Sequence, residues 1–228
     1  MRHSLVSCLI LAAYSTLALS QTLPAQTTNL LVRTDRDCRL NIDGEAKGTL
    51  KAGDSVRVSL PLGEHRVEAV PLPEGPHWEG AVTVTEPDGQ QFSIPLQAAV
   101  TRAEAQRLGY WTDADTGLTW AAADNAVGVS WTQAAGYCRA LSLGAHKDWA
   151  LPSIDELQRL FGGDADPSGR HVTGPIQITG WEWSSSPGRE PGEQWALDFG
   201  DGGRASVVMG DSGLNRALCV RRGETGLK

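Results

Sequence analysis

The chain is short of basic side chains. Its 228 residues include 20 Lys and Arg against 27 Asp and Glu, a formal net charge of −7. Proteins that bind nucleic acids neutralise phosphates with a basic surface, so this balance argues against a nucleic acid partner. It argues equally against a general affinity for anionic membrane surfaces. We therefore expect neither nucleic acid nor an anionic bilayer as the partner.

The chain also lacks an apolar run of the roughly 20 residues that a membrane-spanning helix needs. Its main apolar stretch, residues 5–19, is shorter, follows a basic start at Arg2 and ends beside the small residue Ser20. This order is typical of a secretory signal peptide. We therefore predict a signal peptide at residues 1–20, no membrane span, and an exported protein in the periplasm or at the cell surface.

Residue patterns that carry catalysis are missing too. The histidines have no pairwise spacing that suits a metal site, and the serines at residues 184–186 lie in no Gly-x-Ser-x-Gly setting. Asp155 and Glu156 are neighbours on an expected helix, so their carboxylates point in different directions and cannot act as a pair. We therefore predict that the protein is not an enzyme and has no cofactor.

Turn-forming residues are what the chain has in quantity, with 26 Gly and 12 Pro between short apolar runs. Such a composition is typical of a turn-rich, mostly β protein. Residues 29–97 contain about six strand patterns, among them the alternating segments 55–60 and 65–70. Asp43 and Gly44 form a strong hairpin signal. We predict a small β-sandwich over this region.

A second compositional region follows a short helical segment. Residues 98–108 favour a helix, and Thr101 with Glu104 fits a capping box at its start. Residues 109–222 then hold seven of the eight tryptophans. We therefore predict a linker helix at 98–108 and a second domain at 109–222.

Two helices and several strands are expected in the second domain. Apolar residues recur at helical spacing over residues 131–142, and Ser130 can cap that helix. A second helix follows Pro152, where Ser153 and Glu156 form a capping box. Short strands are expected at 181–184, 194–199, 204–208 and 217–221. The predicted fold class of the whole chain is α+β.

The first domain resembles a known family. Residues 40–50, LNIDGEAKGTL, and residues 56–70, VRVSLPLGEHRVEAV, follow the strand and turn order of the PEGA family of extracytoplasmic β modules. The motif that names the family is absent, and Asp37 and Cys38 stand in its place. The resemblance implies a cell-surface or envelope protein whose first domain has no catalytic centre.

The second domain resembles the Lcl C-terminal domain family, which is named for a bacterial collagen-like adhesin. The matching segments are TDADTGLTW, SWTQAAGYCRALSLGAHKDWALPSIDEL, WEWSSS, QWALDF and ALCVR, in this order between residues 112 and 221. Ala150 departs from the family, which usually carries Arg there. The resemblance implies a C-type-lectin-like fold, with two helices packed beside a twisted antiparallel sheet.

Three cysteines follow the predicted signal peptide, and an odd number leaves one thiol unpaired. Cys38 lies in the first compositional region, so we expect it to be a free, half-buried side chain, with an intermolecular bridge as the alternative. The Lcl resemblance implies that Cys138, on the first helix, bonds Cys219 in the last strand. Such a disulfide requires export, in agreement with the predicted signal peptide.

Tryptophans point to the ligand-binding face. Indole rings provide a large contact area at low entropic cost, and arginine forks suit carboxylates and sulfates. The Lcl resemblance implies sulfated polysaccharides as a class of ligand, because relatives in that family are associated with them. We predict a shallow face on the second domain that binds weakly and depends on multivalency. Its predicted contact residues are Trp181, Trp183, Trp195, Asp198, Arg204 and Arg216.

Calcium is the alternative for sugar binding. Lectins of this fold hold calcium with a Glu-Pro-Asn loop and a Trp-Asn-Asp strand, because the ion needs about six to eight oxygen ligands. Here the corresponding segments read Glu190-Pro191-Gly192 and Trp195-Ala196-Leu197-Asp198, so both asparagines are missing. We therefore expect solvated acidic loops and no metal.

These features together predict a non-enzymatic binding module of the bacterial cell envelope that recognises a glycan or a surface protein. The first alternative is a structural or assembly subunit of an envelope complex, with the second domain as a protein-binding platform. The second is an enzyme of unrecognised type, which a deep pocket with a perturbed acid–base pair would indicate. The sequence predicts no particular oligomeric state.

Overall fold

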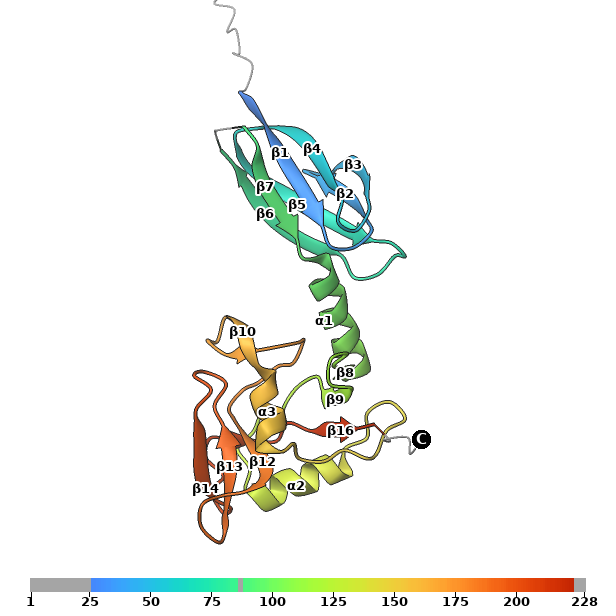
Figure 1. Ribbon diagram of the computed structural model, residues 1–228. Helices are drawn as coiled ribbons and strands as arrows, with labels where there is room; N and C mark the ends of the chain where they lie inside the picture. The colour runs from blue at the N-terminus through green and yellow to red at the C-terminus, as the bar shows by residue number, and fades with distance from the viewer. Residues whose placement is uncertain (1–25, 86–87, 224–228) are drawn as a thin grey trace, which may run out of the picture.

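The computed structural model describes residues 26–85 and 88–223, so the predicted signal peptide lies outside the described residues. The chain is a mixed α+β protein, mostly strands. Figure 1 shows two groups of sheets joined by helix α1 (Leu96–Leu108), and each group has its own hydrophobic core. None of the helices in these residues has the length and apolar character required to cross a membrane.

The first domain consists of two sheets that pack around one core. Its strands have the order β4-β1-β7 in one sheet and β3-β2-β5-β6 in the other. Side chains at every second position, such as Leu30 and Val32 of β1 and Leu40 of β2, are fully buried between the sheets. The bounds are β1 (Thr27–Thr34), β2 (Cys38–Ile42), β3 (Glu45–Leu50), β4 (Ser55–Pro61), β5 (Gly63–Pro71), β6 (Trp78–Val84) and β7 (Gln90–Ile94).

Strand β3 is the element of the first domain that the sequence pattern did not identify as a strand. It forms one edge of its sheet, and only Leu50 among its residues is buried, so it has no alternation of apolar and polar positions. Polar edge strands of this kind protect a sheet from pairing with other chains. The predicted turn before β3 is confirmed, since Asp43 and Gly44 have φ of 53° and 81°, as a two-residue hairpin requires.

Helix α1 begins earlier than predicted, at Leu96, and the predicted capping box is wrong. Thr101 lies inside the helix, and its hydroxyl accepts a hydrogen bond from the Gln97 side chain at 3.1 Å. The first turn is instead capped from the first domain, where Asp35 accepts the Gln97 backbone N–H at 2.9 Å. Leu96 is fully buried in the core of that domain, so tertiary contacts determine where α1 begins.

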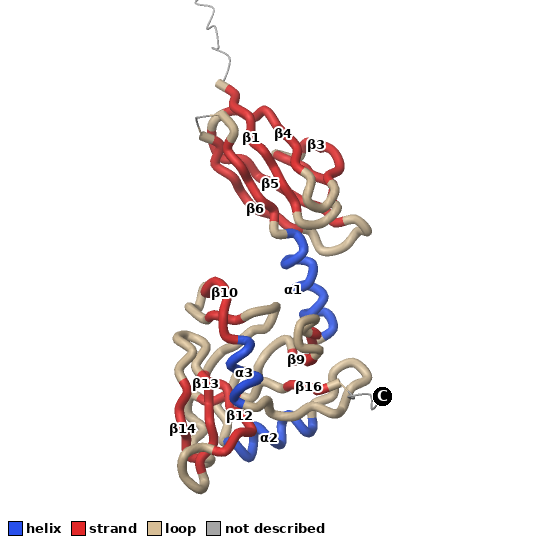
Figure 2. The backbone as a smooth tube through the Cα atoms, viewed as in Figure 1, coloured by secondary structure: helices blue, strands red, loops and turns tan. Residues whose placement is uncertain are grey.

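The second domain contains two main sheets, a small hairpin and two helices (Figures 1 and 2). One sheet has the order β16-β9-β8, the other β14-β13-β12-β15, and β10 pairs with β11. Its helices are α2 (Trp131–Ala140) and α3 (Ile154–Leu160). Its strands are β8 (Tyr110–Thr112), β9 (Leu118–Ala121), β10 (Phe161–Ala165), β11 (His171–Val172), β12 (Trp181–Pro187), β13 (Glu193–Leu197), β14 (Arg204–Val208), β15 (Asn215–Arg216) and β16 (Val220–Arg222).

Both predicted helix starts in the second domain are confirmed. Ser130 caps α2 in a box with Gln133, and Ser153 caps α3 in a box with Glu156. In each box the serine hydroxyl accepts a backbone N–H from the first turn, which would otherwise have no partner. Helix α2 ends two residues earlier than predicted, because Leu141 has an extended backbone with ψ of 135°.

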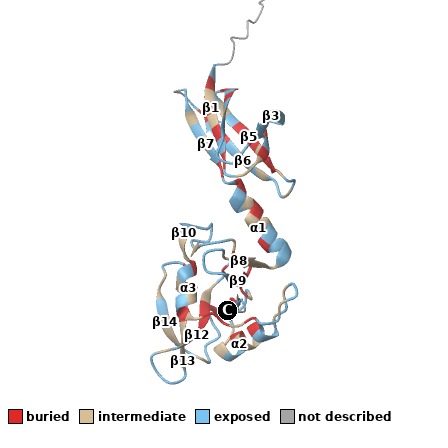
Figure 3. Ribbon diagram, turned by 45° about the vertical axis from the view of Figure 1, so that its right-hand side comes forward, coloured by how far each residue is buried: buried red, intermediate tan, exposed pale blue. Residues whose placement is uncertain are grey.

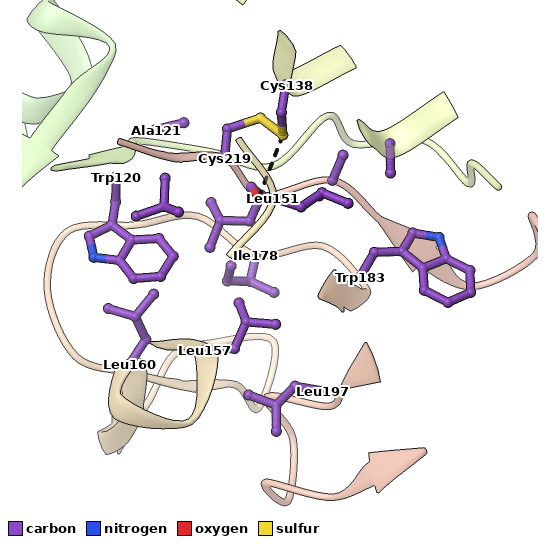
Figure 4. Close-up of a cluster of buried hydrophobic side chains, with 14 of the residues drawn as sticks. Trp120, Ala121, Cys138, Leu151, Leu157, Leu160, Ile178, Trp183, Leu197 and Cys219 are labelled. Carbon is purple, nitrogen blue, oxygen red and sulfur yellow. Dashed lines mark hydrogen bonds between the residues drawn. A yellow bond between two sulfur atoms is a disulfide. The ribbon is translucent and has the colours of Figure 1, made fainter. Parts of the chain in front are cut away.

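The core of the second domain surrounds the disulfide (Figure 4). Cys138 and Cys219 are bonded, with their Cα atoms 5.4 Å apart, so the implied pairing is confirmed. Trp120 and Leu157 pack in the same buried cluster, which links α3 with β9 and the segment before β16. Cys38 is a free, buried cysteine of the first domain. Figure 3 shows that the buried residues lie where sheets and helices face one another.

Candidate binding site

The predicted contact residues do not share one surface. In the β12–β13 ladder Trp183 pairs with Ala196, so Trp181 and Trp183 lie on one face of the sheet and Trp195 on the other. Trp183 is fully buried, and its indole N–H donates to the Val129 carbonyl at 2.7 Å. Trp183 therefore belongs to the core, which corrects our prediction of a ligand contact for this residue.

Trp195 is occupied by a contact within the chain. The Arg189 guanidinium carbon lies 5.3 Å from the centroid of its ring, a distance at which the cation is attracted to the ring face. The Trp195 backbone carbonyl also accepts the Ser184 hydroxyl at 2.7 Å. Trp195 and Trp181 thus face different surroundings and cannot contact one small ligand together.

The predicted polar contacts are also engaged elsewhere. Arg204 Nε donates to Gln158 Oε1 at 2.8 Å, which attaches β14 to α3. Asp198 accepts the Gly200 N–H at 2.8 Å in the turn after β13. Arg216 Nη1 donates to the Gly213 carbonyl at 3.3 Å. Each of these groups stabilises a local turn or packing contact, and only Trp181 and its neighbours remain as a candidate binding surface.

That surface is a shallow recess of about 230 Å³ beside Trp181. Trp181 of β12 and Ala205 and Val207 of β14 lie on the same face of the sheet, as their registers against β13 require. Leu214, in the loop before β15, stands at the rim with 69% of its surface exposed. We call this site the Trp181 recess, and its lining residues are Trp181, Ala205, Val207, Asp211, Gly213, Leu214 and Asn215.

The polar residues of the Trp181 recess contribute little to an outside ligand. Asp211 Oδ1 accepts the Gly213 N–H at 2.9 Å, which closes the turn beneath Leu214. Asn215 is buried. The recess therefore offers mainly carbon surface, whereas a sugar would require several free donors and acceptors beside the indole ring.

Two acidic residues, Glu182 and Asp124, form a buried pair next to the recess, where Glu182 follows Trp181 in β12. Glu182 is fully buried, and its Oε2 accepts the Leu218 backbone N–H at 2.8 Å. Burial raises the pKa of Glu182 well above its usual value, and the negative charge of Asp124 raises it further. Asp124 in turn accepts the Thr179 hydroxyl at 2.9 Å. These contacts hold the segments on both sides of Trp181 together.

Glu182 was not among the residues predicted to matter. The available signal was a carboxylate inside WEW, because a charged residue between two large apolar ones is rare in a strand that is covered on both faces. Its neighbour in space, Asp124, lies 58 residues earlier in the chain, so no local pattern connects the two.

The acidic loops do not converge. Within residues 26–85 and 88–223, no group of three or more His, Cys, Asp and Glu side chains has the arrangement of a metal site. Glu193 Oε2 instead accepts the hydroxyl of Ser206 at 2.5 Å, within the β13–β14 pair.

Comparison with known proteins identifies the second domain. Residues 109–221 match the family model of the Lcl C-terminal domain. The match begins at Gly109, directly after α1, and ends inside β16, so it includes both bonded cysteines and the Trp181 recess. No curated protein matches the chain.

Proposed function

Because residues 109–221 belong to the Lcl C-terminal domain family, a surface- or envelope-related module, we propose that this protein is a non-enzymatic binding module of the bacterial cell envelope. Its Trp181 recess binds an apolar side chain of a partner protein. The second domain thus serves as the rigid platform, and α1 joins it to the β-sandwich. The proposal includes export through the signal peptide at residues 1–20.

The exposed Leu214 beside Trp181 is the observation that carries this proposal. A leucine with 69% of its surface in water, at the rim of a recess lined by an indole and by Val207, is typical of a site that buries apolar area on binding. Burying such a side chain contributes about 1.5–3 kcal/mol, and an aromatic neighbour marks an energetically important contact. A glycan is disfavoured here because the recess has few free polar groups.

Features outside the recess support the envelope location and the fold. The disulfide between Cys138 and Cys219 forms in oxidising compartments and is rare in the cytosol. Two helices beside antiparallel strands, closed head to tail by that bond, support the C-type-lectin-like assignment. Two sheets around one core support the PEGA-like assignment of the first domain.

Site-specific photo-crosslinking in cells tests the proposal. A photoreactive amino acid at position 214 should capture a defined protein, and the adduct should disappear in the Trp181→Ala background and return with Trp181→Phe. Val208 provides the matched control, because it is 61% exposed but follows Val207 and so points to the opposite face of β14. A photoreactive group at 208 should give no such adduct.

Two results would contradict the proposal. One is the same adduct from positions 208 and 214, since that would indicate nonspecific crosslinking that does not depend on binding at the Trp181 recess. The other is the absence of a protein adduct together with binding to a glycan array that depends on Trp181. Running the array with and without EDTA then distinguishes calcium-dependent from calcium-independent sugar binding.

A further inference from the structure

One side of helix α1 forms a groove with the second domain. Ala98, Thr101, Arg102 and Gln106 are spaced at i, i+3, i+4 and i+8, so they form one stripe along the helix. This stripe lines three neighbouring cavities, and the opposite walls come from the second domain. Between Ala98 and Gln106 the helix rises about 12 Å, at 1.5 Å per residue.

The three cavities adjoin one another through lining residues that they share. The first, about 310 Å³, lies between Arg102 and Trp111, and the second, about 250 Å³, shares Arg102 and Pro175 with it. The third, about 300 Å³, shares Gln106 and Gln177 with the second and has Tyr137 in its lining. We call the whole the α1 groove. It has an aromatic side chain at each end.

Backbone geometry shapes the Trp111 end of the α1 groove. Gly174 has φ of 87°, and a Cβ at this position would lie 2.6 Å from the Trp111 ring. Only glycine allows the chain to pass this close to the indole. Trp111 also pairs with the buried Trp120 in the β8–β9 ladder, so its position is fixed before any ligand binds.

Free polar side chains line the α1 groove. Within the part of the chain that the structure describes, the side chains of Arg102, Gln106, Gln177 and Tyr137 make no hydrogen bond. Asp166, also in the wall, is different, because its Oδ1 accepts the Ser168 and Arg170 backbone N–H groups at 2.8 and 2.9 Å. The groove therefore presents unused donors and acceptors between two aromatic rings.

This combination matches the surface of a sugar chain. A pyranose ring has an apolar C–H face that packs on an aromatic ring, and an edge of hydroxyls that planar amide and guanidinium groups can bind in pairs. The backbone of Gln177 is already bonded, as its N–H donates to Ala122 and its carbonyl accepts from Asp124. An extended peptide therefore finds no free strand edge in this wall.

The net negative charge of the second domain indicates whether a bound sugar is charged or uncharged. Residues 109–222 contain fourteen acidic and nine basic side chains, so the domain repels polyanions overall. Arg102 is a cation of the groove, and the Asp166 carboxylate lies in the same wall. We propose that the α1 groove is a second binding site, which takes an uncharged oligosaccharide laid along α1 between Trp111 and Tyr137.

Titration of the full exported chain with chitotetraose, cellotetraose and maltotetraose tests this proposal. Binding of at least one should shift the Trp111 indole N–H resonance in NMR spectra. Changing Arg102→Ala together with Gln106→Ala should weaken that binding about tenfold, since two hydrogen bonds are lost. Alanine is the best helix former, so α1 should remain intact.

Arg107→Ala is the matched control, because Arg107 is half a turn away from the stripe and carries the same charge. It should change the affinity by less than about twofold. The proposal is overturned if none of the three oligosaccharides binds, if the double variant binds as the parent does, or if only sulfated or carboxylated chains or peptides occupy the groove. The outcome is separate from that of the Trp181 recess, because the double variant should keep the adduct at position 214.

Discussion

His65 shows how single side chains stabilise the first domain. Its Nδ1 lies 2.6 Å from the Asp43 carboxylate, and its Nε2 lies 2.9 Å from the Pro61 carbonyl. Both neighbours are acceptors, so the ring is bound best when both nitrogens carry protons. The hydrogen bond to Asp43 raises the pKa of His65 above 6.5, and burial of the ring opposes this only in part.

The first domain should therefore lose stability as the pH rises. A histidine whose pKa is higher in the folded state contributes its full stabilisation below its unfolded value of 6.5, and this contribution disappears as the pH passes the folded value. Urea unfolding between about pH 5 and about pH 9 should show the decline, and His65→Gln should flatten it. His77→Gln is the control, as that side chain is 45% exposed and screened by water. An unchanged slope in His65→Gln would refute the assignment.

At the same scale, tryptophans two positions apart have different roles. Trp183 donates to Val129 and fills the core, while Trp181 lines an open recess. Alternation along the strand predicts that both lie on one face, but a single face can be covered at one position and open at the next. The difference arises from the loop around Val129, which no local pattern in β12 reveals.

Helices in this chain begin where a capping group is available. Ser153 Oγ accepts the Glu156 backbone N–H at 3.2 Å, and the Glu156 carboxylate accepts the Ser153 backbone N–H at 2.6 Å. Glu156 also binds Arg222, so the same carboxylate connects α3 to β16. Burial alone would raise the pKa of Glu156, but the hydrogen bonds from Arg222 and Ser153 outweigh it and lower the pKa.

Ser153 and Thr101 are each followed three residues later by a glutamate, but substitution by alanine should change stability differently at the two positions. Ser153→Ala should destabilise the second domain by about 1 kcal/mol, because a first-turn N–H loses its partner. Thr101→Ala should be neutral or slightly stabilising, because Thr101 lies inside α1, where alanine is the better helix former. Urea unfolding of the two variants checks this, and equal losses of stability would contradict the observed start of α1.

At the scale of the molecule, the residues that the structure describes form two cores and one disulfide, and the disulfide belongs to the second core. Residues of the first core come from positions 30–100, and those of the second from positions 120–220. Helix α1 connects them, with Leu96 in the first core and Gly109 at the boundary of the second domain. Stability should therefore change in one domain without a large change in the other.

Removing the disulfide tests that independence. In the chain-entropy model, a bond across 81 residues stabilises the folded state by about 4–5 kcal/mol. Cys138→Ala with Cys219→Ala should lower the free energy of unfolding of the second domain by this amount and leave the unfolding transition of the first domain unchanged. Calorimetry of both proteins measures the two transitions, with Cys38→Val as a variant confined to the first core. A shift of both transitions by the disulfide variant would contradict two independent cores.

Local patterns in the sequence determined several elements of the second domain. They did not predict β10, β11 or β15, and the strand expected at 217–221 is instead β16 at Val220–Arg222. The helix caps at Ser130 and Ser153 and the strands expected at 194–199 and 204–208 each depend on patterns of a few residues, where sequence order and spatial order agree. The motifs between residues 112 and 221 also identified the family and, through it, the Cys138–Cys219 bond.

The binding surfaces were decided by the tertiary structure. Trp181 meets Val207 and Leu214 only because β12, β14 and the loop before β15 come together on one side of the sheet, and Arg102 faces Trp111 and Pro175 only because α1 packs beside the second domain. Whether a side chain is buried or available depends on residues far away in the chain. The energy of each such contact is set by long-range packing, which the order of neighbouring residues does not encode by itself.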